Sequence, residues 1–235
     1  MVHIFKVYPL LVRIRWESGT PIYNRTLLEL GSWQSNDIQK FDQAISNRID
    51  LENYACLKTD DYYLMSDFNG NESSNVYFAI EKCQNSTSIV TCKSDTEIDR
   101  VLSISNIHIL TVSAYFDSDD YESPIKTYSD DFGQFGLSTL FGQTYEIKVR
   151  QNKAILTDDY FAAISTETHN FYSLETPITR INRSGNQFLL EIYIRLSKES
   201  EQHERVVYSF FDLFGYLGGL FDFLYFVGYF LIEYF

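Results

Sequence analysis

The chain has 235 residues, and its 32 acidic against 19 basic side chains give a formal net charge of −13 at pH 7. This balance argues against nucleic-acid binding, because phosphate groups need Lys and Arg to neutralise them. The length allows one sizeable domain or two small ones.

The N-terminal part of the chain is predicted to contain two strands and one helix. Residues 4–16 favour an extended strand, residues 18–26 (SGTPIYNRT) a turn, and residues 26–30 a second strand. A helix is then expected to begin at Ser35, a suitable N-cap residue. Its apolar side chains recur at helical spacing and predict one face packed on the domain: Ile38, Phe41, Ile45 and Ile49.

The middle of the chain alternates strand patterns with turn and helix signals. Strands are predicted at residues 62–65 and 76–83, separated by a loop with a tight turn at residues 69–71. The sequence Ser-Asp-Thr-Glu has the form of a capping box and predicts a short helix over residues 94–104. The strongest strand pattern of the chain follows at residues 106–116.

The acidic stretch at residues 117–136 is predicted to be an irregular, solvated loop, with Ca²⁺ binding by its carboxylates as the alternative. Residues 144–150 and 153–156 are expected to form a hairpin around a turn at Gln151-Asn152. A last strong strand is predicted at residues 186–196.

The final segment, residues 206–235, is almost wholly apolar. As a helix it would reach roughly 45 Å, more than the bilayer core of about 30 Å, so we interpret it as a transmembrane helix. The alternative is a buried core helix. The predicted organisation is a strand-rich soluble domain at 1–196, a polar linker at 197–205 and the transmembrane helix. The fold class is α+β, mainly β, with a sandwich-like domain and short helices.

One side of the predicted membrane helix carries small and acidic residues. At about 100° per residue this side collects Asp212, Gly215, Gly219, Asp222 and Glu233, with Gly218 close by. Gly215 and Gly219 form a G-x-x-x-G pair that lets another backbone approach closely. We therefore predict helix packing through Gly215, Gly218, Gly219 and Asp222. The alternative places Asp212 and Glu233 at the two membrane surfaces and leaves only Asp222 inside.

Cysteines and sequons bear on the compartment. Cys83 and Cys92 flank a short loop that a disulfide could close, although Cys56 could pair with either, and free structural thiols are equally open. Four N-x-S/T sequons lie in predicted turns and are candidate glycosylation sites: Asn24, Asn71, Asn85 and Asn182.

Motifs for catalysis or cofactor binding are lacking in the sequence. It contains no G-x-S-x-G, no G-x-G-x-x-G, no phosphate-binding loop, and no His/Cys cluster with the spacing of a metal site. We therefore predict no enzyme, no catalytic residue, no cofactor and no metal.

Several stretches carry a family resemblance. YYLMSDFNGNESSNVYFAIEKCQNST, TCKSDTEIDRVLS, YESPIKTY and VVYSFFDLFGYLGGLFDF resemble a large group of ciliate transmembrane proteins, over most of residues 54–222. The resemblance implies a strand-rich, non-cytoplasmic domain between two membrane helices, and no established function. This chain departs from the pattern in the first helix, so we expect it to begin after that helix or from a different gene start.

A second, fold-level similarity is to acid-sensing and degenerin-type channels, in which Gly218-Gly219 and Glu233 would correspond. Our first expectation is a non-enzymatic, membrane-anchored structural or interaction subunit, whose partners are membrane lipid and other transmembrane subunits. The alternative is an ion-channel or sensor-type subunit.

Three locations of the strand-rich body are open. The sequons and the family resemblance place the body on the non-cytoplasmic side, at the cell surface or an endomembrane. A single C-terminal helix by default leaves the body in the cytosol. The mitochondrial inner membrane is the third possibility, as for an accessory subunit of a respiratory assembly.

Overall fold

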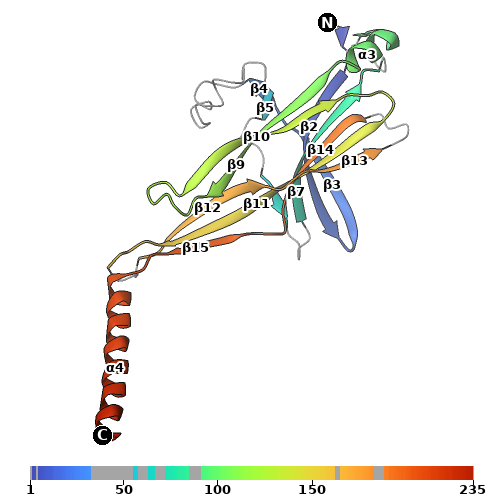
Figure 1. Cartoon of the computed structure of the whole chain (residues 1–235). Coiled ribbons are helices and arrows are strands. Elements are labelled where there is room, and N and C mark those ends of the chain that lie inside the picture. Colours follow the sequence, from blue (N-terminus) through green and yellow to red (C-terminus); the bar gives the residue numbers. More distant parts are fainter. Residues whose placement is uncertain are drawn as a thin grey trace. The chain divides into compact units, whose positions relative to one another are not determined.

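Long β-strands make up most of the computed structural model, which describes residues 2–3, 5–32, 55–57, 63–66, 72–84, 91–161, 165–182 and 188–234 (Figure 1). The predicted helix beginning at Ser35 and the predicted turn at residues 69–71 lie outside these ranges. The chain divides into two compact units. Unit 1 comprises Met1–Tyr115, Thr127–Gln151 and Tyr172–Ser200, and unit 2 comprises Phe116–Lys126, Asn152–Phe171 and Glu201–Phe235.

A twisted sheet forms the body of unit 1, with neighbouring strands in the order β11, β14, β7, β2 and β3. Strands β11 and β14 run parallel, and the other neighbouring pairs are antiparallel. Two short strands, β13 and β6, pair with β11 and β7 respectively. The bounds are β2 (Phe5–Glu17), β3 (Thr20–Leu27), β6 (Met65–Ser66), β7 (Glu72–Lys82), β11 (Gly142–Thr157), β13 (Ile178–Asn182) and β14 (Phe188–Leu196).

Smaller elements of unit 1 complete this arrangement. The hairpin strands β9 and β10 pair with each other, β1 pairs with β8 in parallel, and β4 pairs with β5. Their bounds, with that of helix α3, are β1 (Val2–His3), β4 (Leu30–Ser32), β5 (Ala55–Leu57), β8 (Thr91–Cys92), α3 (Asp95–Leu102), β9 (Asn106–Phe116) and β10 (Ile125–Gly136).

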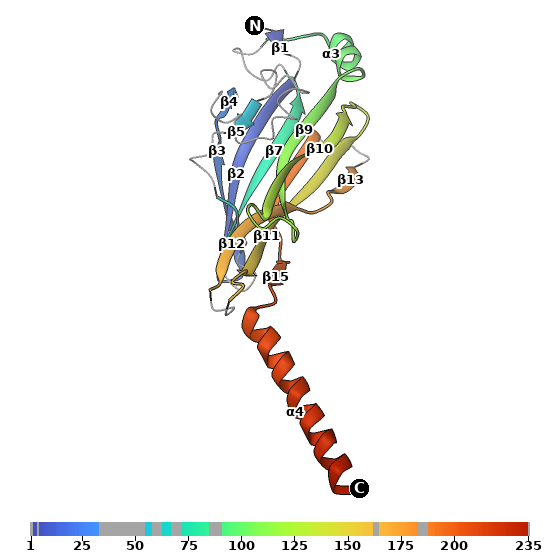
Figure 2. The same cartoon turned by 60° about the vertical axis from the view of Figure 1, so that its left-hand side comes forward.

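The core of unit 1 lies between the inner face of the large sheet and a second layer made by α3, β9 and β10 (Figure 2). Leu190 of β14 is fully buried at 0% exposure, and it belongs to one cluster with Ile98 of α3 and Phe135 of β10. Alternate residues of each strand point to the same side, so one face of the sheet supplies this core. The predicted fold class, mainly β and sandwich-like with a long C-terminal helix, is confirmed.

Helix α3 begins where its capping box predicts. The Ser94 carbonyl accepts the Ile98 N–H at 2.9 Å, and the Ser94 hydroxyl accepts the Glu97 N–H at 3.4 Å. The hydroxyl bond serves a first-turn amide that has no i−4 carbonyl inside the helix, and the Ile98 bond is the first of the regular helical ladder. The helix ends at Leu102, two residues before the predicted end.

Two turn predictions were wrong. Strand β11 runs without a break through residues 151–152, where a hairpin turn was expected. The reason is that Asn152 is buried and accepts the Glu201 N–H on its side-chain oxygen at 3.2 Å, as a strand residue rather than a turn residue. Near the N-terminus the turn is only Ser18-Gly19, both with positive φ, so β3 starts earlier than predicted.

The prediction of an irregular loop at residues 117–136 was also wrong in part, because the second half of this segment is strand β10. Phe135, near the end of this strand, and Leu137, directly after it, are both buried in the core. Strand β10 pairs with β9, which has the predicted bounds.

Unit 2 contains β15 (Gln202–Val206), most of β12 (Glu167–Leu174) and helix α4 (Phe210–Tyr234). The segment expected to be a linker, residues 197–205, thus contains most of a strand, which pairs in parallel with Lys153–Thr157 of β11. Helix α4 starts at Phe210, four residues after the expected start. A second capping box sets this start, since Ser209 and Asp212 exchange backbone-to-side-chain hydrogen bonds of 2.9 Å and 3.2 Å.

Candidate functional site

Helix α4 exposes an apolar surface along its whole length. Figure 2 shows it as one uninterrupted helix, and Phe210–Glu233 is the one span among the described residues that is long and apolar enough to cross a membrane. No residue of its most apolar window is buried. Exposed Phe, Leu and Tyr side chains on every side of a helix are unfavourable in water, so this surface requires an apolar environment.

The residues predicted for helix packing lie open on this helix. A methyl group added at Gly215, Gly218 or Gly219 would meet no atom within 4 Å. Asp222 is exposed on the same helix. Asp212 instead caps the start of the helix, because its carboxylate accepts hydrogen bonds from the Ser209 backbone N–H at 2.9 Å and from the Ser209 hydroxyl at 2.6 Å.

A second exposed surface is the outer face of the large sheet in unit 1, the side away from the core. At its centre, Glu191 of β14 accepts hydrogen bonds from the hydroxyls of Tyr77 at 2.6 Å, Thr144 at 3.2 Å and Tyr193 at 3.3 Å. The rings of Tyr77 and Tyr193 lie 4.7 Å apart, with a tilt of 41°. The outer face therefore holds a carboxylate ringed by hydroxyl donors.

Burial and the nearby carboxylate fix the protonation state of these phenols. Burial raises the pKa of Tyr77 above its usual value, and the hydrogen bond to Glu191 raises it further. The pKa of Tyr193 is also raised, first by burial and then by the charge of Glu191. Both hydroxyls thus remain neutral donors at physiological pH.

The outer face is hollowed by two adjoining depressions. The larger, of about 540 Å³, spans four strands and combines apolar, tyrosine and charged side chains. It is lined by Tyr8, Leu10, Val12, Ile14, Tyr23, Arg25, Asn75, Tyr77, Ala79, Glu81, Phe188, Glu191, Tyr193 and Arg195. The smaller, of about 350 Å³, shares Glu191, Tyr193 and Arg195 with it.

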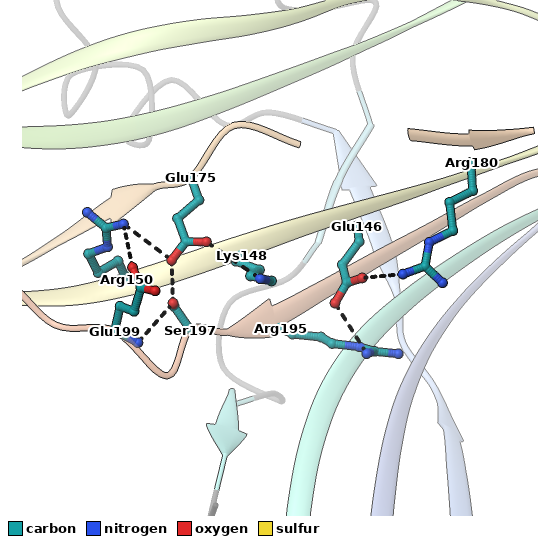
Figure 3. Close-up of polar contacts among 8 residues, drawn as sticks. All are labelled: Glu146, Lys148, Arg150, Glu175, Arg180, Arg195, Ser197 and Glu199. Atoms are coloured by element: carbon teal, nitrogen blue, oxygen red, sulfur yellow. Dashed lines mark hydrogen bonds and ion pairs between the residues drawn. The ribbon is translucent and has the colours of Figure 1, made fainter. Parts of the chain in front are cut away.

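Ion pairs continue across β11, β13 and β14 (Figure 3). Glu146 of β11 lies 3.3 Å from the guanidinium of Arg195 and 4.0 Å from that of Arg180. Arg195 also lies over the ring of Tyr193, 5.1 Å from its centroid. Parallel pairing places Glu146 opposite Tyr193. Arg195 lies two residues further along β14, and its guanidinium can therefore reach the Glu146 carboxylate.

A second carboxylate centre lies further along the same strands (Figure 3). Glu175 contacts Arg150 at 3.5 Å, Lys148 at 3.8 Å and the hydroxyl of Ser197. Arg150 also pairs with Glu199 at 3.4 Å. Both centres combine acids with bases from strands that are far apart in the sequence.

The carboxylates of this face are engaged in hydrogen bonds and ion pairs. Glu146 and Glu175 are engaged by cations, and Glu191 by hydroxyls, so each carboxylate already has partners. Tyrosine rings and arginine guanidiniums, which dominate the energetics of protein interfaces, flank the larger depression. Within the described ranges, no group of three His, Cys, Asp or Glu side chains could hold a metal ion.

The structure places the predicted modification residues as follows. Cys83, which follows β7, and Cys92 of β8 form a disulfide, and Cys56 lies in β5. Asn24 is exposed, but it lies in β3 rather than in a turn, and Asn182 ends β13. Two other predicted sites, Asn71 and Asn85, lie outside the described residues.

Sequence reasoning missed the residues of the outer face. Tyr77 and Tyr193 alternate with core residues in predicted strands, and this alternation was the one available signal. The parallel register of β11 and β14, which assembles the site, has no local signature.

Comparison with known proteins gives one similarity. A family model described as the uncharacterised 80 kDa protein N-terminal domain matches residues 5–197. No curated protein and no solved structure matches the chain. The matched range includes the strands that carry the outer face and ends before β15 and α4.

Proposed function

The chain belongs to the family of the uncharacterised 80 kDa protein N-terminal domain, and from this premise we propose that it is a non-enzymatic, membrane-anchored interaction subunit of a larger membrane assembly. The exposed apolar surface of α4 carries the proposal. Fully burying one Leu or Phe side chain gains about 2 kcal/mol, so leaving many of them in water is strongly unfavourable. The 24-residue span reaches roughly 36 Å, which exceeds the bilayer core of about 30 Å.

The outer face of unit 1 supplies the second half of the proposal. Its occupant is a folded protein subunit of the same assembly. Two arginines and four tyrosines combine a planar apolar surface with hydrogen-bond donors, and such residues act as anchors in protein interfaces. The mixture of Glu81, Glu191, Arg25 and Arg195 favours a partner surface with charges of both signs.

We place the body on the non-cytoplasmic side of the membrane. The Cys83–Cys92 disulfide supports this side, because such bonds persist in oxidising compartments. The exposed sequon at Asn24 is accessible for a glycan. A gel shift on endoglycosidase treatment, lost in Asn24→Gln together with the other sequon variants, is the expected result. An unshifted band places the body on the cytosolic or mitochondrial side.

Extraction from native membranes tests the anchor. The wild-type chain should stay with the membrane in alkaline carbonate and dissolve only in detergent. Leu220→Arg combined with Leu224→Arg should release it, because a charged side chain at the centre of a bilayer costs about 3 kcal/mol. Leu140→Arg is the control, since Leu140 is 86% exposed in unit 1. Release of the wild-type chain by carbonate alone contradicts the proposal.

The size of the assembly in mild detergent tests the outer face. Tyr23→Lys combined with Arg25→Glu changes the rim of the larger depression without touching the core. We expect a smaller complex on a native gel than for the wild type, while Leu140→Lys leaves the complex unchanged. If the Tyr23→Lys/Arg25→Glu variant forms a complex as large as that of the wild type, the outer face is not the surface that binds the partner.

A further inference from the structure

Two strongly exposed aromatic side chains lie beside the start of α4 in unit 2. Tyr160 and Phe161 follow β11, and they are 64% and 63% exposed. The ring of Phe161 stacks on that of Phe210, with centroids 5.9 Å apart and planes 15° apart. It also meets the ring of Phe211 edge-on at 5.3 Å. Phe161 therefore lies at the level of the first turn of the helix.

Backbone hydrogen bonds hold this segment in place. The Phe210 N–H donates to the Tyr160 carbonyl at 2.7 Å, and the Val207 N–H donates to the Thr157 carbonyl at 3.0 Å. The Asp159 carboxylate accepts the Phe161 N–H at 2.9 Å. The exposed rings are thus fixed to the residues that lead into α4.

We propose that Tyr160 and Phe161, together with Tyr208, Phe210 and Phe211, form an aromatic collar that inserts into the headgroup layer of the bilayer. This inference rests on the proposed function, because it requires α4 to cross the membrane. A span of roughly 36 Å exceeds the bilayer core by about 6 Å, and the carboxylate of Asp212 favours placing the first turn, rather than the last, in the interfacial layer. Phe161 contacts that turn, so it reaches the same depth. Tyrosine rings, with an apolar body and a polar tip, favour this layer, and Tyr160 and Tyr208 bring two of them to the collar.

The charges beside the collar select the kind of lipid. Arg205 is buried at 7% exposure and paired with Asp158, so it presents no free cation. Asp212 in the first turn of α4 and Glu204, the neighbour of Arg205 in the sequence, add negative charge to this part of the chain. Anionic headgroups are repelled by such carboxylates, whereas basic clusters attract them. The collar therefore fits the zwitterionic headgroup of phosphatidylcholine.

Tryptophan fluorescence of the full chain in phosphatidylcholine vesicles tests the collar. The native tryptophans are replaced by Trp16→Phe and Trp33→Phe, and Phe161→Trp supplies the probe. We expect emission shifted to shorter wavelength, and stronger quenching by lipids labelled near the headgroup than by lipids labelled at the end of the acyl chain. Replacing part of the phosphatidylcholine with phosphatidylserine should weaken this quenching.

Two further variants in the same background separate the possible outcomes. Leu224→Trp, in the middle of α4, should be quenched by lipids labelled at the end of the acyl chain. If it is not quenched, α4 does not cross the bilayer, and the proposed function itself is contradicted. Leu140→Trp, at a side chain of unit 1 that is 86% exposed, is the reference for a ring in water and should be quenched by acrylamide. The collar is overturned if Leu224→Trp inserts while Phe161→Trp behaves like Leu140→Trp. It is equally overturned if Phe161→Trp is shielded only when other membrane proteins are present, since that result shows a protein cover.

Discussion

Arg205 and Asp158 form a two-contact ion pair inside unit 2, with Nε 3.0 Å from Oδ1 and Nη2 in contact with Oδ2. The same guanidinium donates to the carbonyls of Ser118 at 3.1 Å and Asp120 at 2.9 Å, and it lies over the ring of Tyr121 at 4.3 Å. Hydrogen bonding to Asp158 raises the pKa of Arg205, so its charge is permanent. One side chain thus ties three segments of unit 2 together.

Replacing this arginine should destabilise unit 2. Arg205→Lys retains the charge but loses the planar fork, and it leaves at least one backbone carbonyl without its donor. We expect a loss of about 2 kcal/mol in the free energy of unfolding, measured by urea titration in detergent. Asp158→Asn should cost a similar amount, and the double variant should cost less than the sum of the two. Additive losses would show that the pair does not act as a unit.

The glycine face of α4 gives a prediction about assembly. Gly219→Leu should reduce the size of the native complex while leaving the fold intact, because a Cβ added at this position meets no other part of the chain within 4 Å. Gly228→Leu is the matched control. It lies about two and a half turns further on, on the opposite side of the helix, and its position is equally open. If the Gly219→Leu variant forms a complex as large as that of Gly228→Leu, the glycine face of α4 does not pack against another helix.

The disulfide between Cys83 and Cys92 closes a short loop, with a sequence separation of 9. Cys92→Ser should lower the free energy of unfolding by about 2.5 kcal/mol, because the open chain gains conformational freedom when unfolded. Alkylation of the unfolded wild type without reductant should modify one thiol, that of Cys56, because the other two cysteines are joined. Cys56→Ser retains the disulfide and controls for the loss of a thiol. Full alkylation of the native chain would contradict the bond.

Asp120 makes part of the stability of unit 2 dependent on pH. A hydrogen bond from the Lys126 ammonium, supported by the Ser123 N–H, lowers the pKa of Asp120 to about 2. An unfolded Asp titrates near 3.9, so this contribution is present above about pH 4 and is lost as the pH falls toward 2. The urea concentration at the midpoint of unfolding should therefore fall less steeply for Asp120→Asn than for the wild type as the pH is lowered through this range. Parallel curves for the two chains would contradict the contribution.

Local signals made parts of the fold predictable. Helix α3 is encoded locally, because the Ser94 hydroxyl accepts the Glu97 N–H three residues further on. Strand β9 follows from alternating side chains, and the length of α4 from its apolar run. The start of α4 depended on Ser209 and Asp212, a capping box that was present in the sequence but read as part of an acidic face.

Non-local pairing explains what the sequence did not predict. Asn152 resembles a turn residue until Glu201, which directly precedes β15, supplies the N–H that its side chain accepts. The outer face depends on the parallel register that pairs Glu146 with Tyr193. Nothing within a short window of sequence specifies either partner, so this candidate site could be found only in three dimensions.

The unbroken length of α4 has a consequence for sorting among membranes. A span of roughly 36 Å matches a thick, sterol-rich bilayer more closely than the thinner bilayer of the endoplasmic reticulum, where it would have to tilt. Mismatch costs only fractions of a kcal/mol per ångström, yet this suffices to enrich a protein in one organelle over another. For a chain anchored through α4 with its body on the proposed non-cytoplasmic side, shortening α4 by one turn should therefore shift the chain toward earlier compartments of the secretory route.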